Sequence, residues 1–152
     1  MSAAVRASHP SLLPDPTWEP LRGFWVGAAA GELRIPRCTA CGAFCWYPRE
    51  RCRRCGAAEF AWAATRGRGT VFSFAVVRRA LYAPFAPLVP YATGLVALEE
   101  DPAVRVATRF VDCEPAELRI DLPVHAVFRA LEFPGAAGSL PAPFFTPTRE
   151  TR

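Results

Sequence analysis

Residues 38–56 read CTACGAFCWYPRERCRRCG and contain two copies of C-x-x-C-G, with ten residues between Cys41 and Cys52. Each copy, called a knuckle below, is a tight turn that brings two sulfurs onto one ion, and its glycine tolerates a positive φ. Four thiolates complete a tetrahedron and leave no open position for water, so the motif predicts a structural metal site rather than a hydrolytic one. The expected ligands are Cys38, Cys41, Cys52 and Cys55.

The sequence around the knuckles indicates which metal they are expected to bind. Residues 34–62 hold five of the six cysteines and little else that could form a core. Two disulfides are the alternative, but residues 1–20 lack the basic start, apolar stretch and cleavage site of a secretory signal. The short segment between the knuckles favours a rubredoxin-like ribbon with structural Zn²⁺. Iron stays open, because the same paired knuckles bind it, and rubredoxin-like electron transfer is therefore one possible function.

Two further cysteines and both histidines offer weaker signals. Cys45 lies in an alternating stretch and is interpreted as a bystander thiol rather than an exchange ligand. Cys113 lies in the second half of the chain, and a nucleophilic role would need a base from His9 or His125. His9 belongs to the N-terminal arm and His125 alternates along a strand, so we expect no catalytic pair. Phosphate-binding, serine-hydrolase and zinc-protease motifs are also missing from the sequence.

The pattern changes to β after Gly67. Four short runs rich in Val and Phe, at 70–77, 91–98, 104–111 and 124–130, are separated by turn residues. In the third run one face would carry Val104, Val106, Thr108 and Phe110, and the other Arg105, Ala107, Arg109 and Val111. A half-buried strand requires such an alternation. Residues 132–147 contain so many prolines that we expect at most an edge strand and a tail there. Four clear strands and a weak fifth suit a five-stranded OB-fold barrel.

The rest of the chain completes a mainly β organisation. Leu21, Phe24, Trp25 and Ala28 have the spacing of a short amphipathic helix that Gly31 ends. The expected parts are a flexible N-terminal arm (1–20), a short helix (21–33), a zinc ribbon (34–66), an OB-fold (67–147) and a tail (148–152).

Length and composition agree with this division. With 152 residues, 51% hydrophobic and 21% charged, the chain is globular and fits one domain with a small appendage. No apolar run approaches the roughly 20 residues of a membrane span, so we expect no membrane partner and a cytoplasmic location. Residues 1–79 carry 12 Arg against 5 acidic residues, whereas 80–152 carry 6 Arg against 9, so the basic charge is in the first half.

Several segments in order along both halves carry a family resemblance. They are Phe24-Trp25, Gly31-Glu-Leu33, the two knuckles, Tyr47-Pro48-Arg49, Gly67 to Phe74, Pro90-Tyr91, Val111 to Pro115 and Arg119 to Val124. Over residues 18–147 the chain resembles the zinc-ribbon plus OB-fold family, formerly a domain of unknown function, that accompanies thiolases and enoyl-CoA hydratases. The family pattern has glycine where this chain has Asp121. The resemblance implies a non-catalytic accessory subunit that binds a thiolase-like, ketoacyl-synthase-like or hydratase-like partner and helps form or gate its acyl-CoA site.

Exposed aromatics and arginines would serve that role. The candidates for partner contact are Trp18, Phe24, Trp25, Trp46 and Tyr47, although a local core beneath the ribbon is the simpler interpretation for about half of the aromatics. The candidates for CoA-phosphate contact are Arg78, Arg79, Arg105 and Arg109, because phosphates favour charge-assisted donors. The alternative function is a nucleic-acid-binding module, which residues 34–55 favour with six Arg against one Glu. The acidic second half makes nucleic acid the less favoured partner.

Overall fold

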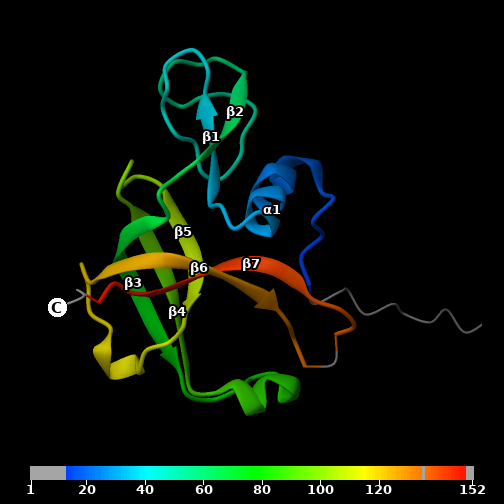
Figure 1. The fold of residues 1–152 in the computed structure, drawn as a ribbon, viewed down its shortest axis with the longest axis vertical. Coiled ribbons are helices and arrows are strands. Elements are labelled where there is room, and N and C mark those ends of the chain that lie inside the picture. The colour runs from blue at the N-terminus through cyan, green and yellow to red at the C-terminus, as the bar shows by residue number, and fades with distance from the viewer. Residues whose placement is uncertain (1–12, 135, 150–152) are drawn as a thin grey trace, which may run out of the picture.

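The computed structural model of the chain describes residues 13–134 and 136–149. Figure 1 shows three parts: a small ribbon, a short helix beside it and a β-barrel below both. The elements in chain order are η1 (Glu19–Leu21), α1 (Arg22–Ala29), β1 (Arg34–Cys38), β2 (Phe60–Ala64), β3 (Arg68–Val77), η2 (Ala83–Leu88), β4 (Tyr91–Leu98), β5 (Arg105–Phe110), η3 (Pro115–Glu117), β6 (Pro123–Leu131) and β7 (Leu140–Pro147). The architecture is mainly β, as the sequence predicts.

Helix α1 (Arg22–Ala29) is shorter than the predicted 21–33, and Gly31 follows its end. Its buried residues Phe24, Gly27 and Ala28 have spacings of three and one, and they form the stripe that an amphipathic helix buries. Gly31 follows with φ +73, a conformation that suits glycine, and the backbone N–H of Glu32 donates to the Gly27 carbonyl at 2.9 Å. The chain therefore turns directly into β1.

The ribbon has one regular hairpin. Strands β1 and β2 pair antiparallel from Arg34↔Ala64 to Cys38↔Phe60. Its own buried cluster consists of Cys38, Cys45 and Cys52, and few other apolar side chains support it. Cation binding must therefore supply much of the stability that packing supplies elsewhere.

The barrel closes in the order β3-β4-β5-β7-β6, with β3 pairing back onto β6. Neighbouring strands are antiparallel except β5 and β7, which meet in parallel at Phe110↔Phe145. The alternation predicted for β5 is confirmed, because Val106, Thr108 and Phe110 are buried while Arg105 is exposed. The short η3 lies between β5 and β6.

Strand β7 is a full barrel strand, whereas the prolines of 132–147 indicated at most an edge strand and a tail. It pairs with β6 from Leu131↔Leu140 to Val124↔Pro147. The prolines at 141, 143 and 147 are an even number of residues from Phe145, so their backbone groups point to the same side of β7 as those of Phe145. That side faces β5, because the Phe145 carbonyl accepts a hydrogen bond from the N–H of Val111, which follows β5. Because neighbouring residues of a strand direct their N–H groups to opposite sides, the missing N–H groups face away from the β6 ladder.

One hydrophobic core joins the helix to the barrel. Phe24, Leu33 and Ile35 belong to the same buried cluster as Val96, Phe145 and other barrel residues. Trp62 of β2 packs against this cluster and lies so close to α1 that a Cβ at Gly23 would be 2.2 Å from its ring. The helix is thus part of this chain's own core.

Parts of two predicted segments cannot be compared with the structure. Residues 1–12 of the expected N-terminal arm, which include His9, lie outside the described residues, and the expected tail is described only to Arg149. None of the helices in the described ranges has the length and apolar character needed to cross a bilayer.

A substitution at Gly94 tests the packing of β3 against β4. A Cβ at this position would lie 2.0 Å from the Ser73 carbonyl oxygen and 2.8 Å from the Phe74 Cα, so the backbone itself would have to move. We expect Gly94→Ala to destabilise the protein by about 1–3 kcal/mol and to lower its Tm by about 3–10 °C in thermal unfolding. Ala75→Val adds volume at an exposed position of β3 and serves as the control. Equal Tm values for the two variants would contradict the packing described here.

Candidate metal centre and adjoining pocket

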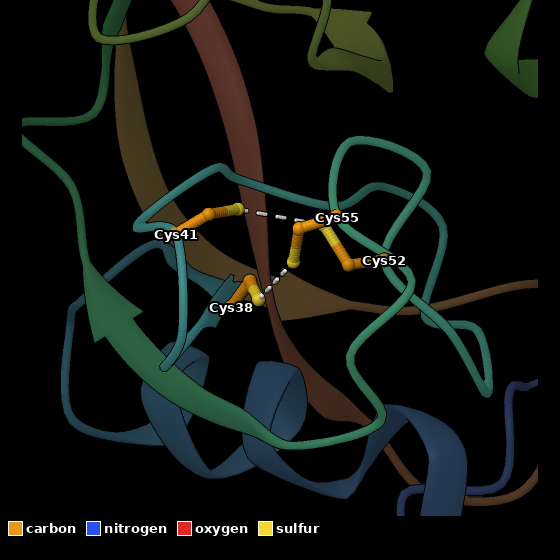
Figure 2. Close-up of side chains that lie close together, drawn as sticks. All are labelled: Cys38, Cys41, Cys52 and Cys55. Carbon is orange, nitrogen blue, oxygen red and sulfur yellow. Dashed lines mark hydrogen bonds between the residues drawn. The ribbon is translucent and has the colours of Figure 1, made fainter.

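The four predicted ligands meet at the tip of the ribbon. Figure 2 shows their sulfur atoms pointing toward one another, Cys38 from the end of β1 and the other three from the loops. All four Sγ atoms lie within 4.8 Å of one another, with 3.6 Å between Cys38 and Cys55 and 3.7 Å between Cys41 and Cys52. A tetrahedral ion with Zn–S bonds of about 2.3 Å needs S···S edges of about 3.8 Å. The arrangement therefore fits a four-thiolate structural metal.

The two knuckles are built by matching hydrogen bonds. Gly42 and Gly56 have φ +72 and +77, and each donates its N–H at 2.9 Å to the carbonyl of the first cysteine of its knuckle. The N–H of that first cysteine donates to the carbonyl of the alanine that follows the glycine, at 2.9 Å in the first knuckle and 2.8 Å in the second. The expectation that glycine permits a positive φ in each knuckle is confirmed.

An arginine before each knuckle extends the match. Arg37 donates from Nε to the Gly42 carbonyl at 2.8 Å, and Arg51 donates from a terminal nitrogen to the Gly56 carbonyl at 3.2 Å. The sequence analysis did not assign a role to these arginines. The signal was present, however, because the repeat is R-C-x-x-C-G-A and not only C-x-x-C-G.

Neighbouring thiols have opposed pKa shifts. Hydrogen bonds from the backbone N–H groups of Cys55 and Arg54 lower the pKa of Cys52 to about 6. The backbone N–H of Ala57 favours the Cys55 thiolate, but hydrogen bonds with the Cys41 and Cys38 thiols, together with desolvation, raise the pKa of Cys55 to about 12. Such shifts mark thiols that compete for one negative charge. A divalent cation removes this competition because it stabilises all four thiolates.

Cys45 lies beside the cluster without belonging to it. Its side chain is buried, its Sγ is 4.0 Å from the Cys52 Sγ, and it is not among the thiols that lie within 4.8 Å of one another. Burial raises its pKa, and the hydrogen bond to Cys52 adds to the shift. This placement supports the interpretation of Cys45 as a bystander thiol.

Cys113 and His125 belong to different segments of the barrel half of the chain. Cys113 follows β5 and is half-buried, and burial followed by the charge of Glu117 raises its pKa. His125 lies within β6, where its Nδ1 is 3.3 Å from the Thr148 hydroxyl. No hydrogen bond joins the two residues in the described part of the chain, and a protonated thiol is a poor nucleophile.

A second feature, the aromatic pocket, lies where the helix, the ribbon and the barrel meet. It encloses about 320 Å³. We define it by Phe24 and Trp25 of α1, Trp46 of the ribbon, Phe85 of η2, Arg109 of β5 and Phe144 of β7. A cavity of about 300–1,000 Å³ with mostly apolar walls and few polar groups is typical of a ligand site.

The five predicted partner-contact aromatics divide into two groups. Phe24 is only 8% exposed, and Trp25 and Trp46 pack partly buried against the core. Trp18 and Tyr47 are 56% and 55% exposed. The simpler interpretation, a local core, therefore accounts for three of them, and Trp18 and Tyr47 offer exposed aromatic surface.

The four predicted CoA-contact arginines lie in three places. Arg78 and Arg79 follow β3 and are exposed. The Arg105 guanidinium stacks 3.7 Å from the centre of the Phe72 ring. The Arg109 guanidinium lies 5.2 Å from the centre of the Phe144 ring, in the aromatic pocket.

Substitution of one ligand tests the metal assignment. Metal analysis of purified protein should find about one ion per chain, which we expect to be zinc. Cys38→Ser should reduce this content to near zero and unfold the ribbon, because the metal supplies folding free energy there. Cys45→Ser is the matched control, since it alters a buried thiol outside the cluster, and it should keep the full content. Retention of the metal in the first variant with loss in the second would overturn the assignment.

Comparisons with known proteins agree with both halves of the structure. The family model for the ChsH2 rubredoxin-like zinc ribbon domain matches residues 25–61, and that for the ChsH2 C-terminal OB-fold domain matches residues 62–129. A DUF35 domain-containing scaffold protein of Methanocaldococcus jannaschii is 34% identical over 67% of this chain and 71% of its own length. A second scaffold protein of this name, from Methanothermobacter thermautotrophicus, is 31% identical over 70% of this chain and 79% of its own length.

Two further relatives have names that refer to enzymes. The 3-oxo-4,17-pregnadiene-20-carboxyl-CoA hydratase alpha subunit of Mycobacterium tuberculosis is 36% identical over 73% of this chain, which spans 33% of that subunit. Among solved structures, a chain of the Ltp2-ChsH2(DUF35) aldolase matches 88% of this chain and 98% of its own length, with a TM-score of 0.71 and 28% identity. The ribbon, the barrel and these relatives together place the chain in the family of DUF35 proteins with a ChsH2-type zinc ribbon and OB-fold.

Proposed function

We propose that this chain is a non-catalytic accessory subunit that binds a thiolase-like, ketoacyl-synthase-like or hydratase-like enzyme and helps form or gate its acyl-CoA site. The observation that carries the proposal is the match over nearly the whole of a chain from an aldolase complex, together with relatives named as scaffold proteins. The relative named as a hydratase subunit supports a role in acyl-CoA metabolism. The raised pKa of the Cys113 thiol, which has no hydrogen bond to His125 among the described residues, supports the non-catalytic part of the proposal.

The surface proposed for the partner includes Trp18 and Tyr47. Tyr47 lies at the aromatic pocket, stacked on Trp46 with ring centres 4.6 Å apart, and Trp18 immediately precedes η1. Large exposed aromatics of this kind are enriched in protein interfaces. We infer that the partner contacts the helix and ribbon on this side.

The proposed acyl-CoA contacts use arginines without a local acidic partner. In the described ranges, the arginines with ion pairs are Arg22, Arg34, Arg129 and Arg149. Arg78, Arg79, Arg105 and Arg109 are therefore available to an anion. Arg78 and Arg79 are the favoured candidates for CoA phosphates, because they precede the Pro-rich loop that contains η2, and barrel loops commonly bind ligands.

The metal in this proposal is a structural Zn²⁺, and the site is cytoplasmic. Four closely placed thiols fit zinc, and cysteines that serve as metal ligands are typical of a reducing compartment. Iron remains the alternative, which would give the purified protein a red colour.

Nucleic-acid binding is the alternative function, and the ribbon provides its support. Arg37, Arg49, Arg53 and Arg54 line a polar cavity of about 450 Å³ between the knuckles and the turn after β4. Glu100 and Asp101 line the same cavity, however, and a four-thiolate divalent site adds a net charge of −2 beside it. An extended basic groove across the barrel, which a nucleic-acid strand would need, is not favoured by the acidic second half of the chain.

Co-purification followed by reconstitution tests the proposed function. A tagged chain expressed in its native host should retain an acyl-CoA enzyme, which mass spectrometry would identify. The isolated chain should show no thiolase, hydratase or aldolase turnover, and the reconstituted complex should be more active than the partner alone. Turnover by the isolated chain, or recovery of nucleic acid without an enzyme, would refute the proposal.

Surface variants make the same experiment specific. Trp18→Ala combined with Tyr47→Ala should weaken the complex about ten-fold or more, because exposed aromatics commonly contribute more than 1 kcal/mol to an interface. Ile120→Ser removes an exposed apolar side chain near η3 and is the control. Equal affinity of both variants would exclude this surface.

A double substitution tests the phosphate contacts. In the reconstituted complex, Arg78→Ala with Arg79→Ala should raise the KM for acyl-CoA about ten-fold or more, since a hydrogen bond to a charged group contributes about 1.5–3 kcal/mol. The control is Arg119→Ala, which removes an exposed arginine that follows η3 in the chain. Unchanged KM and unchanged complex formation would leave Arg78 and Arg79 as surface charges only.

A further inference from the structure

The walls of the aromatic pocket come from the helix, the ribbon and the barrel. Helix α1, the ribbon loop, η2 and strands β4 to β7 all contribute, so the pocket exists only when these parts are assembled. Apolar side chains such as Leu131 and Phe133 form most of the surface, and the lining includes no carboxylate. An occupant must therefore present an apolar body.

The polar groups of the pocket have unused hydrogen-bonding capacity. Arg109 has no ion pair or side-chain hydrogen bond in the described part of the chain, and the hydroxyls of Tyr47 and Tyr91 likewise have no hydrogen bond there. A guanidinium can only donate, so the matching ligand carries an acceptor oxygen.

We propose that the aromatic pocket binds the acyl portion of a carboxylate or thioester ligand, with the Arg109 guanidinium holding the acyl oxygen and the aromatic side chains enclosing the apolar chain. The choice of an acyl ligand rests on the proposed function. The proposal goes further because it places the acyl group inside this chain and not only in the partner's active site.

A protein side chain is the other conceivable occupant. The pocket has about 320 Å³, a cationic group at its wall and no acid, features that suit a ligand with a carbonyl or carboxylate head. A purely apolar partner side chain would leave the Arg109 guanidinium without a hydrogen-bond acceptor, at a cost that an acyl oxygen avoids. The geometry therefore favours the acyl ligand.

Titration of the isolated, metal-loaded chain tests the proposal. The probes are decanoate, decanoyl-CoA and free CoA, followed by isothermal calorimetry and by the fluorescence of the tryptophans. Decanoate and decanoyl-CoA should bind saturably and change the fluorescence, because Trp25 and Trp46 are part of the wall. Free CoA should bind at least ten-fold more weakly.

Matched variants separate the pocket from the rest of the surface. Ala107→Phe places a ring in the pocket from an exposed position of β5 and should abolish saturable binding, whereas Ala75→Phe, exposed on β3 outside the pocket, should not. Arg109→Leu should weaken decanoate binding at least ten-fold, whereas Arg119→Leu, which removes an exposed arginine outside the pocket, should not. Circular dichroism and metal content of each variant report whether the fold is intact.

Three results would overturn the proposal. They are no saturable binding of either decanoyl probe at millimolar concentration, binding that Ala107→Phe leaves unchanged, and equal binding of free CoA. Loss of partner binding in Ala107→Phe without any decanoyl binding would also overturn it and would assign the pocket to a partner side chain. Since these titrations use the isolated chain, their failure is distinct from failure to recover an acyl-CoA enzyme by co-purification.

Discussion

Coordination of one cation by four thiolates is the constraint on which the ribbon depends. The ribbon's own buried cluster is formed by cysteines, and β1 and β2 supply only a short hairpin. Ordering the residues between these strands costs conformational entropy of about 1–2 kcal/mol per residue, which so little apolar burial cannot offset. The metal supplies the difference, because the free energy of binding at a site that the unfolded chain lacks adds to the free energy of folding.

This constraint extends from the first knuckle to the aromatic pocket. Arg37 and Phe44 pair in an isolated antiparallel β-bridge, and the N–H of Cys45 donates to the Pro36 carbonyl at 2.8 Å. Trp46 follows directly, with its ring centre 5.3 Å from that of Phe24 in α1. The metal site therefore positions an aromatic side chain that belongs to both the shared core and the pocket wall.

The sequence predicted those features that local rules determine. Paired knuckles predict a metal because only four convergent thiols satisfy one tetrahedral ion, and the alternation in β5 predicts its buried face because side chains of a strand have a period of two. The sequence analysis expected at most an edge strand where β7 lies. The effect of a proline on a strand depends on whether its missing N–H would have faced a hydrogen-bonded neighbour. That information lies in the pairing of β7 with β6 and β5, and it is not local.

The aromatic pocket was beyond sequence reasoning for a related reason. Phe24, Phe85 and Phe144 are far apart in the chain, and each is an ordinary apolar residue of its own element. The sequence indicated that about half of the aromatics would pack locally, and Phe24, Trp25 and Trp46 do so. It could not indicate that the same residues would enclose a cavity, since this depends on how the ribbon and helix are seated on the barrel.

The two structural supports of the pocket differ in kind. The barrel side rests on a closed hydrogen-bonded ladder and a core that includes Val96 and Phe145, neither of which involves a thiol. The ribbon side rests on the cation, because Trp46 lies between the two knuckles and has no hydrogen-bonded strand of its own. Loss of the metal would thus leave the barrel closed while releasing one wall of the pocket. The ion would therefore control the shape of the aromatic pocket, the site that we propose for the acyl ligand.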